Sequence, residues 1–530
     1  MNPTAPTQPK KSKVNIGSIS LLLIGTSLIS QVLGFLRTKL VNGNFPPTGR
    51  GSTDAYFAAF TIPDLFFFTL AAGALGVAFM PILADHLQQN DRKGVWELST
   101  SLLNLLAILM AIVGVIMFVF AHPIVHLVAP KLSPDQLNNA ASIMRLVAFN
   151  PLLFTISGIL TSVQQTMGRF FFYAIAPLFY NASIIASIFI FRHNIGLVGL
   201  GVGAAVGAVL QLIVVVIGTS RLDFHYRPHI NWQSPDFRTI LRNLPPRSLD
   251  QGIDQIGNVV ETRIASTIGS GAISYYNNAF TLSTAPILLI GTAISTAAFP
   301  RLNQRLSQGR PDLFRQDFLA VLRVMIWISA PLVVACFFAR GYLARLIFTR
   351  DNAQIAIIFG FLTVAIFFRI IYAIVSRWFY AQKDTKTPLF VSIFTIGLNI
   401  FLAYSLSRPT SYGLEGLALA QSITAVVEVF VLGLIMIKRD PKLFDLAFLN
   451  GVSKIVSVTG FTIVAGFIAV SFYPLTSGDQ GFFVLGSKLT FISLVIFSVH
   501  IALSALFGLE EVRPFFVRIR RIVIKPFRSL

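Results

Sequence analysis

The chain has 530 residues, of which 54% are hydrophobic and 12% charged, and its formal net charge is +20. A water-soluble protein of this length needs more polar surface, so the composition excludes an ordinary globular protein and indicates a protein that crosses a membrane many times. The basic residues are scattered between apolar runs, which argues against nucleic-acid binding, and the single Cys336 excludes a disulfide framework or a cysteine metal cluster.

Membrane-spanning helices are predicted along nearly the whole chain, because a span needs about 20 mainly apolar residues. Ahead of them, residues 1–16 form a polar, basic tail without a signal-peptide cleavage site, so we expect a retained cytoplasmic tail. About fourteen spans are predicted on this length rule. They lie near 17–38, 55–84, 99–124, 141–164, 171–193, 196–218, 244–268, 272–299, 317–339, 354–381, 388–407, 413–437, 453–474 and 483–508.

The basic loops set the orientation of these spans. Cytoplasmic loops carry an excess of Lys and Arg, and with the N-terminus inside, the basic loops at 301–315 and 438–442 and the basic tail at 511–530 all face the cytoplasm. If the polar segment 244–268 did not cross, each of them would face outward. The charge pattern therefore favours crossing and predicts that both termini are cytoplasmic.

An internal repeat divides the chain. "AFMPILADHLQQ" at 78–89 matches "AAFPRLNQRLSQ" at 297–308, and "GLVGLGVGAAVGAV" at 196–209 matches "GLEGLALAQSITAV" at 413–426. The fold class predicted is all-α integral membrane, with two six-helix pseudo-repeats, 17–220 and 237–440, around a central cavity and two extra helices within 450–510. An even number of spans per half gives parallel repeats, with substrate expected between the halves.

The span 244–268 carries an ionisable face. On a helix at about 100° per residue its polar members fall within an arc of about 80°, whereas Arg263 points almost the opposite way. These members are Arg247, Asp250, Asp254, Asn258 and Glu261. Charges at membrane depth need water or a partner. Three interpretations stay open: a salt-bridge ladder, a wet cavity whose acids take up a coupling cation or a proton, and a helix lying flat in the interface.

The first two spans also carry polar residues. Arg37 could anchor an anionic head group, because guanidinium pairs bidentately with phosphate, or it could snorkel to the outer interface. Asp54 opens the second span, and Pro63 and Asp64 interrupt it; such breaks usually face water or neighbouring helices, so we expect Asp64 to face a cavity. No Walker loop, His/Asp metal box or nucleophile elbow is present, which argues against an enzyme.

Four stretches resemble the MviN/MurJ family of lipid II flippases, in the multidrug/oligosaccharidyl-lipid/polysaccharide exporter superfamily. They are "SQVLGFLRTKL" at 30–40, "STDAYFAAFTIPDLFFFTLAAGALGVAFMPILADH" at 52–86, "KDTKTPL" at 383–389 and "GLEGLALAQS" at 413–422. The resemblance implies fourteen spans, a cytoplasmic (inner) membrane location, a cationic cavity for the pyrophosphate, and a groove at the last two helices for the lipid tail.

The resemblance also implies roles for particular residues. Arg37 and Asp54 match a family arginine and aspartate, and Glu261 aligns with a carboxylate of a sodium site, with Asn399 as a second ligand; the carboxylate could equally serve a proton. Other cavity positions depart from the family. Its charged residues fall on Gln31, Phe67 and Ala72 and near Asn278, Ala279 and Leu282, and Arg247 and Arg263 are the candidates to replace them.

The resemblance implies that the chain moves undecaprenyl-pyrophosphate-linked peptidoglycan precursor, lipid II, from the inner to the outer leaflet by alternating access. One alternative is a cation-coupled exporter of another polyprenyl-linked glycan or an amphipathic drug. The other is a non-transporting scaffold for cell-wall enzymes, which would have no need of charges at membrane depth. Expected partners are lipid II or a related glycolipid, membrane lipids and cell-wall synthesis proteins; no cofactor is expected beyond sodium or a proton for coupling.

Overall fold

The computed structural model describes residues 16–72, 79–348, 352–408 and 410–513, without the side chains of 16–21, 24, 70–72, 243 and 245–251. The predicted tails 1–16 and 511–530 therefore lie almost entirely outside the described residues. Over the described residues the secondary structure is helical and contains no strand. The predicted all-α fold class is confirmed.

The first half begins with the long helix α1 and a second helix that is broken by a π-helical segment, η1. Its elements are α1 (Ile16–Asn44), α2 (Thr53–Phe66), η1 (Phe67–Ala72), α3 (Met80–Gln88), α4 (Arg92–Val119), α5 (Ala121–Val128), α6 (Pro134–Val147), α7 (Asn150–Thr166), α8 (Phe171–Phe191) and α9 (Val198–Ser220). The short helix α5 directly follows the long helix α4, and the chain then reverses its direction.

The second half repeats this order, with one long helix, α15, in place of α6 and α7. Its elements are α10 (Pro235–Ile268), α11 (Ala272–Pro286), η3 (Ile287–Thr292), α12 (Ala293–Ser307), α13 (Pro311–Phe338), α14 (Arg340–Ile347), α15 (Asn352–Ala381), α16 (Lys386–Leu406) and α17 (Glu415–Arg439). Two further helices follow, α18 (Leu446–Phe472) and α19 (Phe482–Leu506), and a short turn, η4 (Glu510–Val512). The two pseudo-repeats and the two added helices agree with the predicted architecture.

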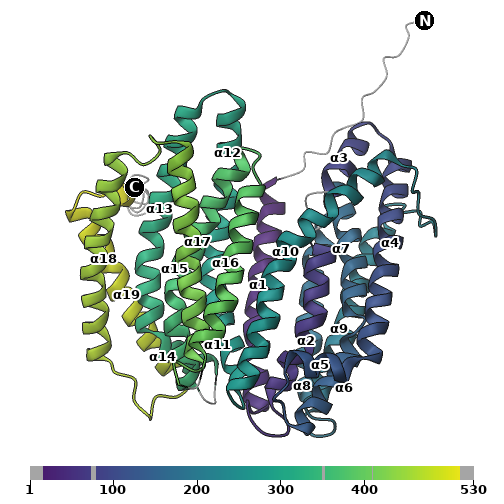
Figure 1. The fold of residues 1–530 in the computed structure, drawn as a ribbon, viewed down its shortest axis with the longest axis horizontal. Helices are drawn as coiled ribbons and strands as arrows, with labels where there is room; N and C mark the ends of the chain where they lie inside the picture. Colours follow the sequence, from purple (N-terminus) through teal and green to yellow (C-terminus); the bar gives the residue numbers. More distant parts are fainter. Residues whose placement is uncertain (1–15, 73–78, 349–351, 409, 514–530) are drawn as a thin grey trace, which may run out of the picture.

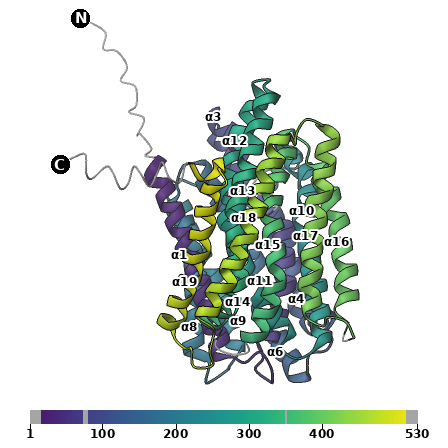
Figure 2. The ribbon, with the colours of Figure 1, turned by 90° about the vertical axis from the view of Figure 1, so that its left-hand side faces the viewer.

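Eleven helices within the described residues are long and apolar enough to cross a membrane. Helices α1 and α10 and the broken helix α2–α3 occupy the other three predicted spans. The two halves stand side by side, and α18 and α19 flank the second half (Figure 1). Seen from that flank, most of the long helices run nearly parallel to one another (Figure 2). The protein is a multi-pass membrane protein.

Helix α10 lies between the two halves (Figure 1). Its first turns pack into the first half, where Phe237 and Ile240 are fully buried, whereas Ala265 near its end belongs to the core of the second half. Gly252 lets it approach η1 closely, because a Cβ at that position would lie 2.7 Å from a side-chain carbon of Thr69. The polar segment 244–268 is thus part of a 34-residue helix inside the bundle, not a helix lying flat.

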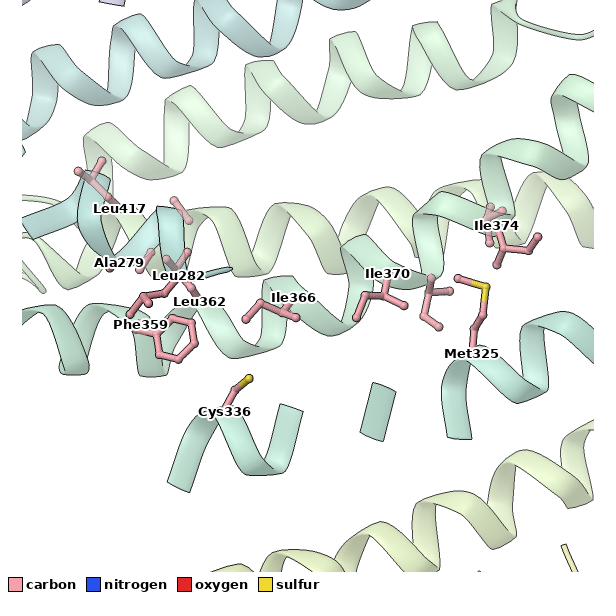
Figure 3. Packing of buried hydrophobic residues seen from close by; sticks show 14 of the residues in the cluster. Ala279, Leu282, Met325, Cys336, Phe359, Leu362, Ile366, Ile370, Ile374 and Leu417 are labelled. Carbon is pink, nitrogen blue, oxygen red and sulfur yellow. The ribbon is translucent and has the colours of Figure 1, made fainter. Parts of the chain in front are cut away.

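The largest apolar core belongs to the second half. Met325 and Cys336 of α13 contribute to the cluster that also contains Ile366, Ile370 and Ile374 of α15 (Figure 3). Close packing of this kind supplies the dispersion contacts that hold helices together in lipid. Cys336 is a free, buried cysteine in this core, where it fills space as a small apolar residue.

Both halves break their second helix in the same way. Pro63 lies inside α2 just before η1, and Pro286 closes α11 directly before η3. Proline removes a backbone donor and disturbs the preceding turn, and a π-helical turn accommodates the disturbance. The helices that follow the breaks along the chain, α3 and α12, project on the same side of the molecule (Figure 1). We call this the predicted inner side, from the loop charges, and the side of α5 and α14 the predicted outer side.

Candidate functional site

Asp54 joins the two halves on the predicted outer side. It is 2% exposed, and its carboxylate accepts hydrogen bonds from the backbone N–H of Gly271 (2.6 Å), from the backbone N–H of Ser274 (2.7 Å) and from the Ser274 hydroxyl (2.7 Å). The first N–H groups of a helix lack partners within it, and the helix dipole favours a negative charge there. Asp54 of the first half therefore caps α11 of the second half.

Two further contacts strengthen this junction. The side-chain amides of Asn42 and Asn278 donate to each other's oxygens, at 2.8 and 3.2 Å, and the hydroxyls of Thr53 and Ser274 lie 2.7 Å apart. The family resemblance leads us to expect a charged residue near Asn278. Instead, Asn278 forms hydrogen bonds with Asn42 of α1. Asp54 was predicted as a cavity residue; it lies buried in the outer junction, where it also lines a cavity of about 330 Å³.

Arg37 and Asp64 lie near each other in the first half. Arg37 is partly exposed and Asp64 exposed, although both lie within helices of the bundle. They are close enough for their charges to interact, and the same charges reach Tyr56 and Tyr180. Within the described residues Arg37 forms no ion pair closer than 4.0 Å. Its guanidinium is therefore held less tightly than the paired arginines of the second half.

A cavity of about 360 Å³ opens within the second half, lined by α10, α11, η3, α15, α16 and α17. Glu261 of α10 lines this cavity and is 2% exposed. Its carboxylate accepts hydrogen bonds from the Tyr276 hydroxyl (2.9 Å) and from the Gln421 side-chain amide (2.6 Å). A buried carboxylate at membrane depth requires such donors.

The network continues from Gln421 to Arg369 and Glu428. Arg369 donates to the Gln421 side-chain oxygen at 3.4 Å and lies 3.6 Å from the Glu428 carboxylate, which also accepts from the Ser392 hydroxyl at 2.9 Å. The Glu428 side chain is 4% exposed and that of Arg369 30% exposed. One arginine therefore balances two buried acids, one of them through Gln421.

Asn399 adds an unsatisfied acceptor to this cavity. It lines the cavity from α16 and is 4% exposed, and its side-chain oxygen has no hydrogen-bond partner among the described residues. A buried amide oxygen without a donor is costly unless something else fills its coordination. The structure therefore brings both predicted cation ligands, Glu261 and Asn399, to the same cavity.

The predicted ionisable face of α10 is recovered in part. Asp254, Asn258 and Glu261 all line the cavity of the second half, and Asp254 is exposed to it. The side chains of Arg247 and Asp250 lie outside the described part of the chain. Arg263 points away from this face and donates to the carbonyl of Leu127 at the end of α5, so it binds a helix end instead of replacing a cavity arginine.

Four residues of this network were not predicted from the sequence: Arg369, Gln421, Tyr276 and Glu428. Arg369 and Glu428 lie in the middle of the apolar runs 354–381 and 413–437, and a charge inside a span is by default a functional candidate. That signal could have identified both residues. Nothing in the pattern marks Tyr276 or Gln421, because their roles depend on the contact with Glu261.

An apolar groove of about 390 Å³ lies between the second half and the added helices. Phe35 of α1, Leu289 of η3, Cys336 of α13 and Phe497 of α19 are among its lining residues. Leu289 is 63% exposed, which is large for a side chain that borders a groove. The groove involves the last helix, as the resemblance implies for a lipid tail, and also involves α1 and α13.

The protein consists of two repeated helical bundles that meet on one side. These bundles hold charged side chains at membrane depth and border an apolar groove. Together these features define a membrane transporter with parallel internal repeats. The chain belongs to the lipid II flippase MurJ family, whose model matches residues 50–489. A lipid II flippase MurJ of Burkholderia cenocepacia is 28% identical over 401 residues, covering 72% of this chain and 76% of the relative. A probable lipid II flippase MurJ of Bdellovibrio bacteriovorus is 23% identical over 519 residues, covering 95% and 96%.

Solved structures share the fold. A lipid II flippase MurJ in an inward closed conformation superposes with a TM-score of 0.76 at 21% identity, covering 92% of this chain and 98% of that one. A multidrug resistance MATE family transporter of the MOP superfamily, in an inward-facing conformation, gives a TM-score of 0.68 at 17% identity, covering 80% and 98%. The fold is thus shared with a solved MurJ structure and with a transporter of the MOP superfamily.

Proposed function

We propose that this protein carries lipid II from the inner to the outer leaflet of the cytoplasmic membrane by alternating access. The observation that carries the proposal is the match of the lipid II flippase model to residues 50–489. Lipid II joins a long apolar tail to a pyrophosphate and a polar disaccharide-pentapeptide. The apolar groove beside α19 is the proposed place of the tail, and Arg37 is the proposed contact of the pyrophosphate.

Arg37 is the proposed pyrophosphate contact of the first half. Guanidinium donates two parallel hydrogen bonds to phosphate oxygens, and it does so best when no carboxylate already holds it. Arg37 meets this condition, because its nearby acid Asp64 is within electrostatic range without forming a close ion pair. The pyrophosphate would then replace weak contacts instead of breaking a strong one.

The test is complementation of a bacterial strain depleted of its own lipid II flippase. We expect the unmutated protein to restore growth and cell shape, and Arg37→Ala to abolish rescue while Arg37→Lys retains part of it. Membrane insertion of each variant is checked by immunoblotting of the membrane fraction. A correctly inserted, unmutated protein that gives no rescue would overturn the assignment of lipid II as substrate.

The cavity of the second half is the proposed coupling site. Glu261 and the unpartnered oxygen of Asn399 face the same space, and a proton on Glu261 or a sodium ion between the two oxygens would satisfy both groups. Binding there would change the contacts of Glu261 with Gln421 and Tyr276 and so link α10, α11 and α17 to the ion. Such a link is how an ion gradient can bias the two access states.

Transport in proteoliposomes separates the two ions. We expect Glu261→Gln, which keeps the shape and removes the charge, to abolish the response to an imposed gradient, and Asp254→Asn to serve as the matched control in the same cavity. A response to a pH gradient at constant sodium identifies the proton, and a response to sodium at constant pH identifies sodium. If Glu261→Gln still responds to either gradient, the coupling site lies elsewhere.

The proposed topology places both termini in the cytoplasm. The support is the excess of Lys and Arg on the side of α3 and α12, toward which α1 begins and α19 ends (Figure 1). In a Cys336→Ser background, a cysteine introduced beside Arg310 should react with a membrane-impermeant reagent only after the cells are opened. Labelling in intact cells would reverse the orientation.

A further inference from the structure

The segment that connects the two halves, residues 221–234, lies along α4. The side-chain amide of Asn104 donates to the backbone carbonyls of Arg227 (2.9 Å) and His229 (3.0 Å). The Tyr226 hydroxyl in turn donates to the Asn104 side-chain oxygen at 2.8 Å. Asn104 is 8% exposed, so this polar contact is largely enclosed. We call residues 221–234 the linker.

Helix α4 presents a polar stripe that matches the linker. Glu97, Ser101 and Asn104 are spaced four and three residues apart, which places them on one face of the helix. The backbone N–H of Asn231 donates to the Ser101 hydroxyl at 3.1 Å, and the Asn231 side chain donates to Glu97. Non-helical backbone at the edge of a bilayer needs its polar groups satisfied by protein, and this stripe satisfies them.

The linker reaches the membrane boundary. Asn104 stands twelve residues beyond the start of α4 at Arg92, roughly 18 Å along the helix at 1.5 Å per residue. The residues of α4 just beyond Asn104, such as Ile108 and Ile112, are exposed and apolar, as expected for side chains that face lipid. The first part of α4 therefore lies outside the bilayer, and the boundary falls between Arg92 and Ile108. The linker therefore occupies the interfacial layer on the predicted inner side.

Beneath the linker is a cavity of about 800 Å³, which shares no lining residue with the cavity of the second half or with the apolar groove beside α19. Its wall consists of apolar residues of α4 and α7, including Leu103, Ile108 and Ile156. Its rim carries Tyr226 and Trp232, which are 55% and 54% exposed. Exposed Tyr and Trp side chains beside an apolar wall are typical of the lipid head-group level.

Two arginines near this rim have no acidic partner within 4.0 Å among the described residues. Arg227 and Arg238 are exposed, and the Arg238 guanidinium donates to the backbone carbonyl of Trp232 at 2.8 Å, which keeps it beside the rim. Of the neighbouring acids, Glu97 accepts from the Asn231 side chain, Asp236 is 3.0 Å from the His86 ring, and Asp223 stays exposed on the linker. Basic residues at the cytoplasmic membrane surface attract anionic lipids.

We propose that this cavity binds an anionic phospholipid of the inner leaflet. One acyl chain lies on the wall that contains Ile108 and Ile156, and the phosphate lies at the rim between Arg227 and Arg238. The bound lipid would hold the linker against α4, which is where the connection between the two halves is anchored. The inference does not depend on which substrate the protein transports.

Trp232 provides a direct measurement. The chain has four tryptophans, and the other three, Trp96, Trp327 and Trp378, are at most 9% exposed. In the full-length protein reconstituted in vesicles, we expect brominated phosphatidylglycerol to quench tryptophan fluorescence more strongly than brominated phosphatidylcholine at the same mole fraction. Trp232→Phe should remove this difference. Equal quenching by the two lipids, or a difference that persists in Trp232→Phe, would overturn the proposal.

The arginines test the head-group contact. Each basic residue near the surface contributes about 1 kcal/mol to the attraction, so Arg227→Gln or Arg238→Gln should weaken the apparent affinity for phosphatidylglycerol about fivefold. Arg310→Gln is the matched control, because Arg310 is 54% exposed on the same predicted side but belongs to the second half. If the double variant Arg227→Gln/Arg238→Gln retains the preference, or Arg310→Gln loses it equally, binding is not at this site.

Discussion

The two halves of the protein share one arrangement of helices but differ in the charges they carry inside. Arg37 lies about two turns before the end of α1, and Glu261 lies about two turns before the end of α10. Arg37 has no close acid partner among the described residues, whereas Glu261 accepts two hydrogen bonds and connects through Gln421 to Arg369. The same backbone arrangement thus holds an arginine without a close acid partner in the first half, and a buried hydrogen-bonded network around Glu261 in the second half.

This difference shows how one helical scaffold can serve two tasks. A cation that is not already paired can exchange its weak contacts for those of an anionic substrate. An acid held by protein donors changes its contacts only when its charge state or its counter-ion changes. We therefore propose that the first half contacts the substrate and that the second half carries the coupling site, a division that substitutions in each half can test.

The largest effect on stability is expected from Arg369→Ala. The substitution leaves Glu428 buried without its cationic partner, and removing one member of a buried pair costs roughly 3 kcal/mol. The double variant Arg369→Met/Glu428→Leu should recover most of that loss, because it removes both charges. Thermal unfolding in detergent measures both. An Arg369→Ala protein that unfolds at the parent temperature would show that the second half has no such network.

Arg37→Ala is the matched variant in the first half. Because Arg37 has no close ion pair to lose, its removal should change stability by no more than about 0.5 kcal/mol. The same variant should abolish complementation. A large loss of stability would mean that Arg37 holds the first half together, and the contrast between the halves would disappear.

The junction between the halves should respond at an intermediate level. Asp54→Ala removes the acceptor for three hydrogen bonds from Gly271 and Ser274, and a lost hydrogen bond to a charged group costs roughly 1.5 to 3 kcal/mol. Asp54→Asn keeps an oxygen acceptor and should lose less. We expect the unfolding temperature to fall in the order parent, Asn variant, Ala variant, and an unchanged temperature for Ala would show that the junction does not stabilise this state.

A pH-dependent effect is expected at matched positions on the predicted inner side, where His86 of α3 corresponds in the repeat to Arg305 of α12. Burial of the His86 ring opposes protonation, but hydrogen bonds to Asp91 and Asp236, at 2.9 and 3.0 Å, prevail and raise its pKa. Arg305 contacts Asp317 at 2.8 Å and keeps its charge at all relevant pH values.

The pH dependence of the His86 contact follows from that direction. A raised pKa in the folded state means that the contribution is complete below the unfolded value, about 6.5, and is lost as the pH rises through the folded value. We expect a loss of at most about 1 kcal/mol, visible as an unfolding temperature that falls from pH 6 to pH 9. His86→Gln should flatten that profile, whereas Arg305→Gln should leave it unchanged. A profile that is the same in His86→Gln would assign the pH dependence to other groups.

Much of the fold could be predicted from the sequence. Long apolar runs specify helices wherever they occur in a membrane, and the loop charges together with the repeat identified 244–268 as a helix of the bundle despite its polarity. The repeat also predicted that the second half begins with this helix. The helical periodicity identified Asp254 and Glu261 as candidates, the family resemblance added Asn399, and the structure brings all three to one cavity.

The sequence by itself determined the spans, the two halves and the presence of charges at membrane depth, because apolar length and periodicity are properties of contiguous residues. Only the tertiary structure decided what those charges contact. Asp54 caps a helix more than 200 residues further along the chain, and Glu261 accepts from Gln421, 160 residues away. The geometry of a hydrogen bond depends on which helices pack together, and that packing brings residues from distant parts of the chain to the same place.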